Sequence, residues 1–500
     1  MAPASADHAR DSPPFSIKYT KLFIDGEFVD AISGKTFETV DPRSGEAITS
    51  VAEADAADVD KAVKAACKAF DEGPWPRLSG YERGRILFKF ADLMEQNTDE
   101  LAYLETLDNG KPLIMSKYAD VTGSVKCVRT VAGWADKISG QTFKLDGPYQ
   151  GMSIYEPYGV TGAIIPWNFP MLSFVLKVAP SLAAGNSIVV KPAEQTPLTA
   201  LYLAALAKQA GVSDGALNVL PGFGPTAGAA ISGHMDINKV GFTGSTEVGR
   251  IIMEAAAKSN LKPVTLELGG KSPLVICEDA DLDAAVDIAN VALFSNMGQC
   301  CTAGSRIFVQ ESIYEAFVNK AVEKAKKRVV GDPFKAGVEQ GPQANETQFK
   351  KILEYIESGK GEGAQLLTGG NPVGNKGYYI EPTIFGDVKD DMKIAREEIF
   401  GPVMSVLKFK TLDEVVKRAN DSMYGLAAAV VTKDIDVANR LARSFRAGTV
   451  WINCYHVYDQ SLPFGGYKMS GIGREQGLHS ILAHMQLKAI ISPLKDSPWL

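Results

Sequence analysis

The sequence predicts an α/β fold in which parallel sheets are flanked by helices and a small β arm projects from the body. Three observations support this prediction. Strand-like and helix-like segments alternate over 158–270, a second alternation follows over 271–470, and isolated strand-like segments lie at 142–157 and 484–494. Such alternation is typical of a parallel sheet flanked by helices. The two isolated segments are expected to form a separate small sheet.

The N-terminal part is predicted to contain strands and turns over 19–50 and helices to about residue 137. The segment 55–70 is predicted to be a helix, because its apolar residues recur at helical spacing and acidic residues occupy its first turn. Residues 1–18 have no apolar core and carry a single arginine beside Asp7 and Asp11. We therefore expect a short disordered tail on a cytosolic protein, without a secretory or mitochondrial leader.

The first alternation consists of nine segments. Strands are predicted at 158–165, 187–192, 216–222, 237–245 and 262–270, and helices at 171–185, 197–211, 225–232 and 245–260. Ligands of such sheets bind beyond the carboxyl ends of the strands. The segments expected there are "PWNFP", "KPAEQ", "GFGPT", "FTGS" and "ELGG".

The second alternation contains a loop with two adjacent cysteines. A strand at 272–277 precedes a helix that Asp281 is expected to cap, and the loop "FSNMGQCCTAGSR" follows over 294–306. Next come a strand at 306–310 and a long helix, for which Ser312 and Glu315 are predicted to form a capping box.

Composition excludes several classes of protein. The chain has 500 residues, of which 45% are apolar and 22% charged, and its net charge is −7. These values indicate a globular protein of two to four domains and do not favour binding to nucleic acid or an anionic membrane. The six cysteines are scattered and form no CxxC pair, so we expect reduced thiols in a reducing compartment and no zinc site.

The adjacent pair Cys300 and Cys301 has several possible roles. Buried cysteines are commonly inert, and a disulfide between neighbours would be strained. The small and polar residues around the pair favour an accessible sulfur instead, and at most one of the two should face a given cleft. A thiol hydrolase would pair its cysteine with histidine, yet none of the five histidines shows a recognisable signature with this loop. An NAD-independent thioester hydrolase and a non-catalytic scaffold stay open as alternatives.

Other polar residues at the predicted ligand end suggest a base and a nucleotide site. Glu267 closes a strand and is the best candidate for a general base. The Gly-rich turn "GFTGSTEVG" leads into a helix at Ser245, whose free N–H groups would favour a pyrophosphate. Lys191 and Glu194 stand at another strand end, where a carboxylate would bind ribose hydroxyls and repel a 2′-phosphate. This favours NAD over NADP.

With these pieces in place, the chain resembles the NAD-dependent aldehyde dehydrogenases over nearly its whole length. It is most similar to the cytosolic and mitochondrial class that forms homotetramers, and to the plant cytosolic branch in particular. The matching motifs are "PWNFP", "KPAEQTP", "GFTGSTEVG", "LELGGKSP", "NMGQCCTAGSR", "EEIFGPV" and "PFGGYKMSGIGRE".

The resemblance implies a mechanism. Cys301 would attack the aldehyde carbon as a thiolate, and the side-chain amide of Asn168 with the backbone N–H of Cys301 would stabilise the alkoxide. Hydride transfer to the nicotinamide would leave a thioester, which water activated by Glu267 would hydrolyse to a carboxylic acid. Cys300 would face elsewhere. The resemblance also implies the residues along the cofactor, which are Ile164, Ile165, Pro166, Trp167, Lys191, Glu194, Gly224, Gly244, Ser245, Gln348, Lys351, Glu398 and Phe400.

The resemblance further implies three domains, described as a Rossmann-like NAD-binding domain, an α/β catalytic domain and a bridging arm for oligomerisation. After the tail at 1–18, they are expected at 19–137 with 158–269, at 270–469, and at 138–157 with 470–500 respectively.

The substrate tunnel is expected to be wide and aromatic. Matching positions place in it Gly123, Phe169, Leu172, Leu176, Ser295, His456, Tyr458 and Phe464. Small residues at Gly123, Leu176 and Ser295 would widen the tunnel, and the rings would suit a flat substrate. We therefore hypothesise a bulky aromatic substrate such as the hydroxycinnamaldehydes coniferaldehyde and sinapaldehyde. The alternative is broad-specificity detoxification of aliphatic aldehydes.

Overall fold

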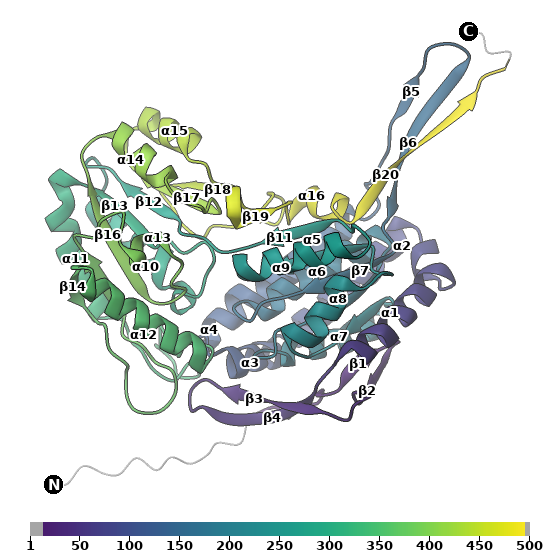
Figure 1. Ribbon diagram of the computed structural model, residues 1–500, viewed down its shortest axis with the longest axis horizontal. Coiled ribbons are helices and arrows are strands. Elements are labelled where there is room, and N and C mark those ends of the chain that lie inside the picture. Colours follow the sequence, from purple (N-terminus) through teal and green to yellow (C-terminus); the bar gives the residue numbers. More distant parts are fainter. Residues whose placement is uncertain (1–13, 496–500) are drawn as a thin grey trace.

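The computed structural model describes residues 14–495, which form two bodies and a projecting arm (Figure 1). The first body contains a sheet in the order β19-β11-β10-β7-β8-β9-β1-β2. Its parallel strands are β7 (Val160–Ile164), β8 (Ser187–Lys191), β9 (Leu217–Val219), β10 (Lys239–Thr243) and β11 (Val264–Glu267). Antiparallel strands β1 (Leu22–Ile24), β2 (Glu27–Val29) and β19 (Gly471–Ile472) close its edges.

The helices of the first body cover this sheet and include the predicted crossovers. The crossover helices are α6 (Pro170–Ala184), α7 (Leu198–Ala210), α8 (Ala229–Gly233) and α9 (Thr246–Lys258). The others are α1 (Ala56–Asp71), α2 (Gly80–Gln96), α3 (Thr98–Asn109), α4 (Leu113–Met115), α5 (Thr122–Trp134) and α16 (Gly477–Leu482). The five strands and the helices predicted over 158–270 are thus confirmed, although the short helix predicted at 225–232 begins as a π-turn over Gly224–Gly228.

The second body contains a sheet in the order β14-β15-β16-β13-β12-β17-β18. Its strands are β12 (Pro273–Ile276), β13 (Arg306–Gln310), β14 (Gln365–Thr368), β15 (Thr383–Gly386), β16 (Val403–Phe409), β17 (Ala427–Val431) and β18 (Thr449–Ile452). Its helices are α10 (Leu282–Phe294), α11 (Tyr314–Lys326), α12 (Glu346–Gly361), α13 (Lys393–Arg396), α14 (Leu412–Asn420) and α15 (Ile435–Ser444). Asp281 caps α10 as predicted, since its side chain accepts a hydrogen bond from the Ala284 N–H.

The capping box predicted for Ser312 and Glu315 is wrong. A 3₁₀ turn over Glu311–Ile313 precedes α11, which therefore begins at Tyr314, one residue later than a Ser312 cap requires, and no side chain caps it. The Ser312 hydroxyl donates instead to Glu278, 2.7 Å away.

The arm is formed by the two isolated segments, as predicted. β5 (Thr142–Lys144), β6 (Tyr149–Pro157) and β20 (Met485–Pro493) make an antiparallel sheet that extends away from the body (Figure 1). The expected arm segment 470–500 begins too early, however. β19 pairs with β11 in the first sheet and α16 packs on α6, so the chain returns to the first body before it enters the arm.

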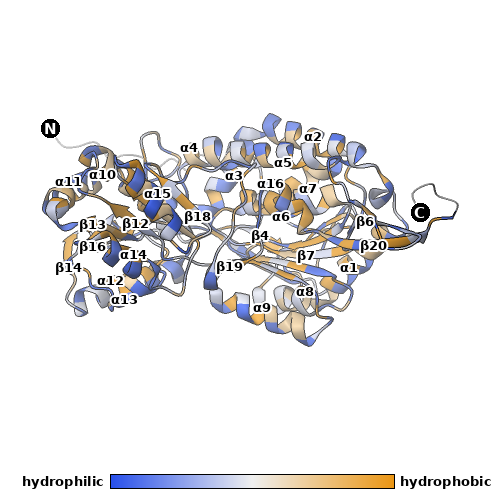
Figure 2. Ribbon diagram, turned by 90° about the horizontal axis from the view of Figure 1, so that it is seen from above, coloured by the Kyte–Doolittle hydropathy of each residue, from blue (hydrophilic) through white to orange (hydrophobic). Residues whose placement is uncertain are grey.

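Burial of apolar side chains between sheets and helices explains why both bodies form. Strands β7 and β8 are buried along their whole length, and helices α6 and α7 beside them are buried over most of their residues. Helix α9, on the other side, combines hydrophilic and hydrophobic residues (Figure 2). None of the helices described is long and apolar enough to cross a membrane.

The expected tail at 1–18 lies outside the described residues up to residue 13. Beyond that point the Phe15 ring packs on Tyr103 and Lys18 pairs with Glu100, so residues 14–18 lie against the first body.

Two further strands lie apart from these sheets. β3 (Thr36–Asp41) and β4 (Glu46–Ala52) form a two-stranded antiparallel sheet close to the N-terminal end of the described chain (Figure 1). This agrees with the strands and turns predicted over 19–50.

Candidate active site

Glu267 stands where the two bodies meet. It is the last residue of β11, it lies between Thr243 of β10 and Gly471 of β19, and only 5% of its surface is exposed. The strand ends there because two glycines follow. Gly269 and Gly270 lead the chain directly into the second body, so Glu267 lies close to the loop that carries the cysteines.

The two glycines are required by close approaches. A Cβ on Gly269 would lie 2.3 Å from the Glu398 carboxylate, and a Cβ on Gly270 would lie 2.3 Å from the Cys301 carbonyl oxygen. Only glycine leaves room for both neighbours. The motif "LELGGK" therefore lets Glu398 and the cysteine loop pack against the end of β11.

The cysteine loop has an unusual backbone. Asn296, Met297 and Gly298 have φ values of 49°, 58° and 73°, in the left-handed region. Such a conformation costs energy at non-glycine residues and persists only where the surroundings hold it. Gln299 supplies one such contact, since its Oε1 accepts from the Ala344 N–H at 2.9 Å. The strained turn sets the direction in which Cys300 and Cys301 leave the loop.

The two sulfurs have different surroundings. Cys300 is 7% exposed and belongs to the core of the second body, whereas Cys301 is partly exposed. The hydrogen bond with Cys301 lowers the pKa of the Cys300 thiol, and His456 and Thr302 act in the same direction. The same bond raises the pKa of Cys301. The pKa values therefore favour Cys300 as the thiolate, whereas exposure favours Cys301 as the nucleophile. Only an accessible sulfur can reach the carbonyl carbon of a substrate.

Although no histidine shows a signature with the loop in the sequence, His456, one of the expected tunnel residues, contacts it. His456 Nε2 lies 3.8 Å from Cys300 Sγ, although the two residues are 156 positions apart. The His456 ring packs edge to face on Tyr455 and Trp451, which holds it beside the loop. The sequence carries no local signal for this pair, because the contact depends on how the 453–464 segment folds over the cysteine loop.

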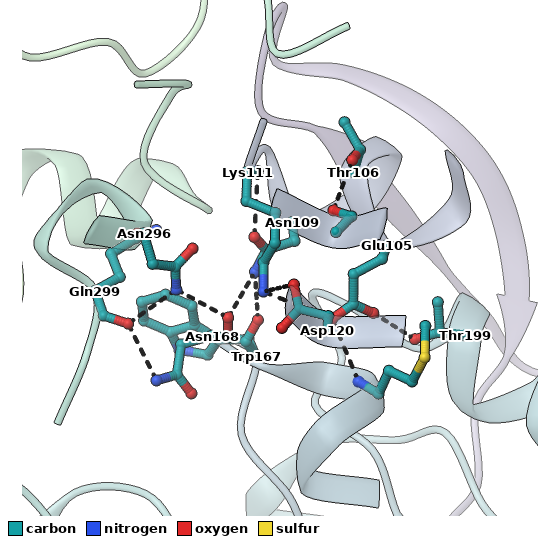
Figure 3. A network of polar contacts seen from close by, with 12 residues as sticks. Glu105, Thr106, Asn109, Lys111, Asp120, Trp167, Asn168, Thr199, Asn296 and Gln299 are labelled. Carbon is teal, nitrogen blue, oxygen red and sulfur yellow. Dashed lines mark hydrogen bonds and ion pairs between the residues drawn. The ribbon is translucent and has the colours of Figure 1, made fainter. Parts of the chain in front are cut away.

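Asn168 is anchored beside the cysteine loop (Figure 3). It is 6% exposed, and its Nδ2 donates to the Gln299 carbonyl at 3.1 Å. Asn296 Nδ2 donates to the same carbonyl at 3.1 Å and to the Asn168 carbonyl at 3.0 Å. An amide nitrogen carries two hydrogens, so Asn168 keeps one donor beyond its bond to Gln299.

Glu267 lies in an electrostatic setting that suits a base. Its Oε2 has no hydrogen-bond partner among the described residues. Burial raises the pKa of Glu267 to about 8, against the opposing charges of Lys177 and Arg474. Lys177 is itself buried and forms an ion pair with Glu475. Burial lowers the pKa of Lys177 to about 8, so two buried groups of opposite charge type titrate in the same range.

The expected ribose and pyrophosphate residues lie at the carboxyl ends of the first sheet. Lys191 Nζ is 3.2 Å from Glu194 and donates to the Gly222 carbonyl at 2.6 Å. Ser245 caps α9 through the Val248 N–H, and Gly244 precedes it. A Cβ on Gly224 would meet no atom within 4 Å. These residues form an open, amide-rich surface with one carboxylate.

The expected nicotinamide residues gather at the junction of the bodies. Glu398 accepts from the Gly270 N–H at 2.8 Å, and burial raises its pKa to about 7. Gln348 Nε2 donates to the Phe400 carbonyl at 3.0 Å, and the Phe400 ring meets Trp167 edge to face at 5.3 Å. Cys300, Glu398 and Phe400 line a small cavity at this junction. Of the remaining expected cofactor residues, Ile164, Ile165 and Pro166 lie at the end of β7, and Lys351 lies on α12.

The expected pocket residues fall into two groups. Tyr458 donates to or accepts from Thr302 Oγ1 at 2.7 Å, and its ring lies 6.1 Å from His456 and 6.0 Å from Phe464. The other group lies on helices or at their ends: Gly123 on α5, Phe169, Leu172 and Leu176 at and along α6, and Ser295 after α10. A Cβ on Gly123 would meet no atom within 4 Å, so this position is open.

Sequence reasoning missed several polar residues of the site. The sequence did not single out Lys177 and Glu475, which lie behind Glu267. Nor did it single out Asn296, which lies behind Asn168. One signal was available, because Lys177 is the only charged residue in the apolar helix α6. Glu475 is 298 positions away from Lys177, and nothing in its local pattern indicates the pairing.

Comparisons with known proteins agree with this arrangement. The model of the aldehyde dehydrogenase family matches residues 28–490. The chain is 59% identical to the mitochondrial benzaldehyde dehydrogenase of Antirrhinum majus, over 100% of this chain and 93% of that one. It is 57% identical to the mitochondrial aldehyde dehydrogenase family 2 member B4 of Arabidopsis thaliana, over 98% and 91% of the chains. The NAD+ complex of the aldehyde dehydrogenase of Bacillus cereus superposes with a TM-score of 0.94 at 48% identity, over 96% and 97%.

Proposed function

The chain belongs to the aldehyde dehydrogenase family, and we propose that it oxidises a bulky aromatic aldehyde of the phenylpropanoid type to the carboxylic acid with NAD+. The observation that carries the choice of substrate is the group of rings beside the cysteine loop. The Tyr458 ring lies 6.1 Å from that of His456 and 6.0 Å from that of Phe464, and its hydroxyl is hydrogen-bonded to Thr302, the residue after Cys301. Stacked and edge-to-face rings favour a flat aromatic partner.

The residues present fit NAD. The N-terminus of α9 offers free N–H groups for a pyrophosphate, and Ser245 and Gly244 stand at it. Lys191 and Glu194 would hold the adenosine ribose, and the Glu194 carboxylate would repel a 2′-phosphate. Glu398 and Phe400 would hold the nicotinamide end. When bound, NAD+ supplies the acceptor for the hydride that leaves the aldehyde carbon.

Cys301 is proposed as the nucleophile. Cys301 is partly exposed, whereas Cys300 is buried, and it follows the strained turn of the loop. Attack on the aldehyde carbon forms a C–S bond and an alkoxide. The second hydrogen of the Asn168 amide, with the Cys301 N–H, is proposed to bind this oxygen, a contribution typically worth about 3 kcal/mol of the barrier.

Glu267 is proposed as the general base of the hydrolytic step. After the hydride has left, the substrate carbon is a thioester on Cys301. The Glu267 carboxylate, free at Oε2, takes a proton from water while the water oxygen attacks the thioester carbon. The C–S bond breaks, the carboxylic acid is released, and the carboxyl of Glu267 gives its proton to the departing Cys301 thiolate, which restores the thiol and the carboxylate. The charges of Lys177, which is paired with Glu475, and of Arg474 oppose the effect of burial on the pKa of Glu267.

The finer biological setting is part of the same proposal. We propose a homotetramer, supported by the exposed apolar residues of the arm sheet such as Leu487 and Ile491, which are 60% and 66% exposed. Light scattering would test this, since the expected mass is four times the 53.6 kDa of one chain. We propose the cytosol as the compartment, although the two plant relatives are mitochondrial by name. Fractionation of cells that express the chain would decide.

Two alternatives keep specific support. Broad-specificity oxidation of aliphatic aldehydes needs only a roomy pocket, which the open position at Gly123 would provide. A thioester hydrolase that works without NAD is favoured by a single contact, the one between His456 and Cys300. That hydrolase would turn over a thioester substrate without NAD+, and His456→Ala would abolish this activity while Cys301→Ala would spare it.

The deciding experiment compares coniferaldehyde with acetaldehyde by NADH formation. The proposal expects kcat/KM to favour coniferaldehyde by about tenfold or more, which is about 1.4 kcal/mol of transition-state discrimination. The relative from Antirrhinum majus is named for benzaldehyde, an aromatic aldehyde, which supports this expectation. A ratio near one or below it would overturn the aromatic substrate and leave the oxidation itself in place.

A further inference from the structure

The C-terminal end of α3 reaches across the first body to the segment 167–171, which carries Asn168 (Figure 3). Three side chains from this end contact that segment. Asn109 donates to its backbone, Lys111 lies against the Phe169 ring, and Glu105 accepts from the Met171 N–H at 3.4 Å. All three are buried. We call Asn109, Lys111 and Glu105 the α3 brace.

Asn109 makes the shortest of these contacts. Its Nδ2 donates to the Trp167 carbonyl at 2.7 Å and to the Asn168 carbonyl at 3.4 Å. Its Oδ1 accepts from the Lys111 N–H at 3.2 Å. The chain reverses at once after Asn109, because Gly110 adopts a φ of 88° and ends the helix. The amide of Asn109 is thereby held in one orientation.

Lys111 and Glu105 fix the end of α3 in place. Lys111 Nζ lies 2.9 Å from Asp120 and 3.6 Å from Glu105, and 4.4 Å from the centre of the Phe169 ring. Glu105 also accepts from the Thr199 hydroxyl at 3.0 Å. Buried charges are costly unless they are paired, and breaking such a pair is strongly destabilising. The charged part of the brace is therefore rigid.

We infer that Asn109 is a positioning residue that sets the place of the Asn168 amide. The inference rests on the proposed function, in which Asn168 binds the alkoxide. The Asn168 carbonyl is held from one side by Asn109 and from the other by Asn296, while its side chain reaches the Gln299 carbonyl. Without Asn109, the peptide between Trp167 and Asn168 loses its bonds on the α3 side and can rotate. A displacement of about 1 Å in a catalytic contact can lower the rate by about 100-fold.

A double-mutant cycle tests the inference. The variants are Asn109→Ala, Asn168→Ala and the two combined, measured for kcat and for KM of NAD+ and aldehyde. We expect Asn109→Ala to lower kcat by about 10- to 100-fold and to leave KM for NAD+ within about twofold. In the Asn168→Ala background, the same change should alter kcat by less than about twofold, because its route of action is gone.

A matched control is available at the other end of α6. Asn186 is fully buried, and its Nδ2 donates to two carbonyls, those of Ser181 and His484, while its Oδ1 accepts from the Gly159 N–H. It thus makes the same set of bonds as Asn109. Asn186→Ala should lower the melting temperature to a similar extent, and its small effect on kcat should be unchanged in the Asn168→Ala background.

A second variant covers the case in which Asn109→Ala does not fold. Asn109→Asp keeps the size and the acceptor, but its carboxyl can donate to Trp167 only while it is protonated. We expect the ratio of wild-type to Asn109→Asp kcat to rise with pH. A ratio independent of pH would overturn the inference, and so would full multiplication of the Asn109→Ala and Asn168→Ala effects. If Asn168→Ala itself leaves kcat unchanged, the proposed role of Asn168 fails and the inference fails with it.

Discussion

Gly270 and the Cys301 carbonyl are in direct contact across the junction of the two bodies: a Cβ on Gly270 would lie 2.3 Å from that oxygen. The contact joins the end of β11, which carries Glu267, to the loop that carries the proposed nucleophile. The distance between base and thioester therefore depends on a residue with no side chain.

Gly270→Ala should lower kcat by about 10- to 100-fold, because the added methyl group must push the cysteine loop away from β11. Steady-state NADH formation would measure it. Gly361→Ala is a suitable control, since that glycine lies at the end of α12 and a Cβ there meets no atom within 4 Å. A Gly270→Ala enzyme with the wild-type kcat would contradict the proposed contact.

Substitution of the two cysteines should have very different effects on kcat. We expect Cys301→Ala to lower kcat by at least about 1,000-fold, and Cys300→Ala to keep at least about a tenth of it. The reason is accessibility, since Cys300 is buried in the core of the second body. Peptide mapping of the acyl-enzyme would locate the thioester. Its appearance on Cys300 would reverse the assignment.

The hydrolytic step should depend on pH through Glu267. Its pKa is raised to about 8, so the carboxyl is protonated and inactive as a base below that value. Single-turnover hydrolysis should therefore speed up from pH 6 to about 8 and level off above. Glu267→Gln should be slow and flat over this range, and the acyl-enzyme should accumulate in it. A wild-type profile without this rise would rule out Glu267 as the titrating base.

Lys177 should tune that profile. Its charge opposes the rise in the Glu267 pKa, so Lys177→Met should move the midpoint of the pH profile to higher pH. The same single-turnover measurement gives the midpoint. An unchanged midpoint or a shift to lower pH would mean that the Lys177 charge is not what opposes the rise in the Glu267 pKa.

Leu176→Trp tests the width of the pocket. Leu176 is partly exposed on α6, which also carries Leu172 and begins just after Phe169. The tryptophan ring is larger than the leucine side chain and would narrow the substrate pocket. We expect kcat/KM for coniferaldehyde to fall by about tenfold and that for acetaldehyde to change by less than about threefold. Equal losses on both aldehydes would contradict the pocket and point to a general disturbance.

Much of the fold was predictable because its signals are local. The parallel strands over 158–270 are continuous apolar segments, helix α6 ends at Gly185 with a φ of 94°, and Asp281 caps α10. Each of these depends on residues a few positions away. The capping box at Ser312 failed for a related reason: a 3₁₀ turn shifted the start of α11, and the pattern of residues alone does not separate the two kinds of helix.

The candidate site was predictable where its residues lie in motifs at strand ends. Glu267, Asn168 and Lys191 follow this rule, because carboxyl ends of parallel strands converge on one edge. Cys301 lies instead in the loop before β13, where its motif identified it. The partners that set their chemistry do not follow it. Lys177 with Glu475, His456 with Cys300, and Asn109 with Trp167 are separated by 298, 156 and 58 positions.

The sequence by itself determined the α/β class, the order of the elements, the family resemblance and which residues are proposed as the reactive groups. Periodicity, caps and motifs act between near neighbours, so one chain without its fold already contains them. Only the tertiary structure decided which buried charge faces Glu267, which sulfur stays accessible and what holds Asn168. Those properties come from desolvation and from hydrogen bonds between distant segments, and both exist only once the chain has packed.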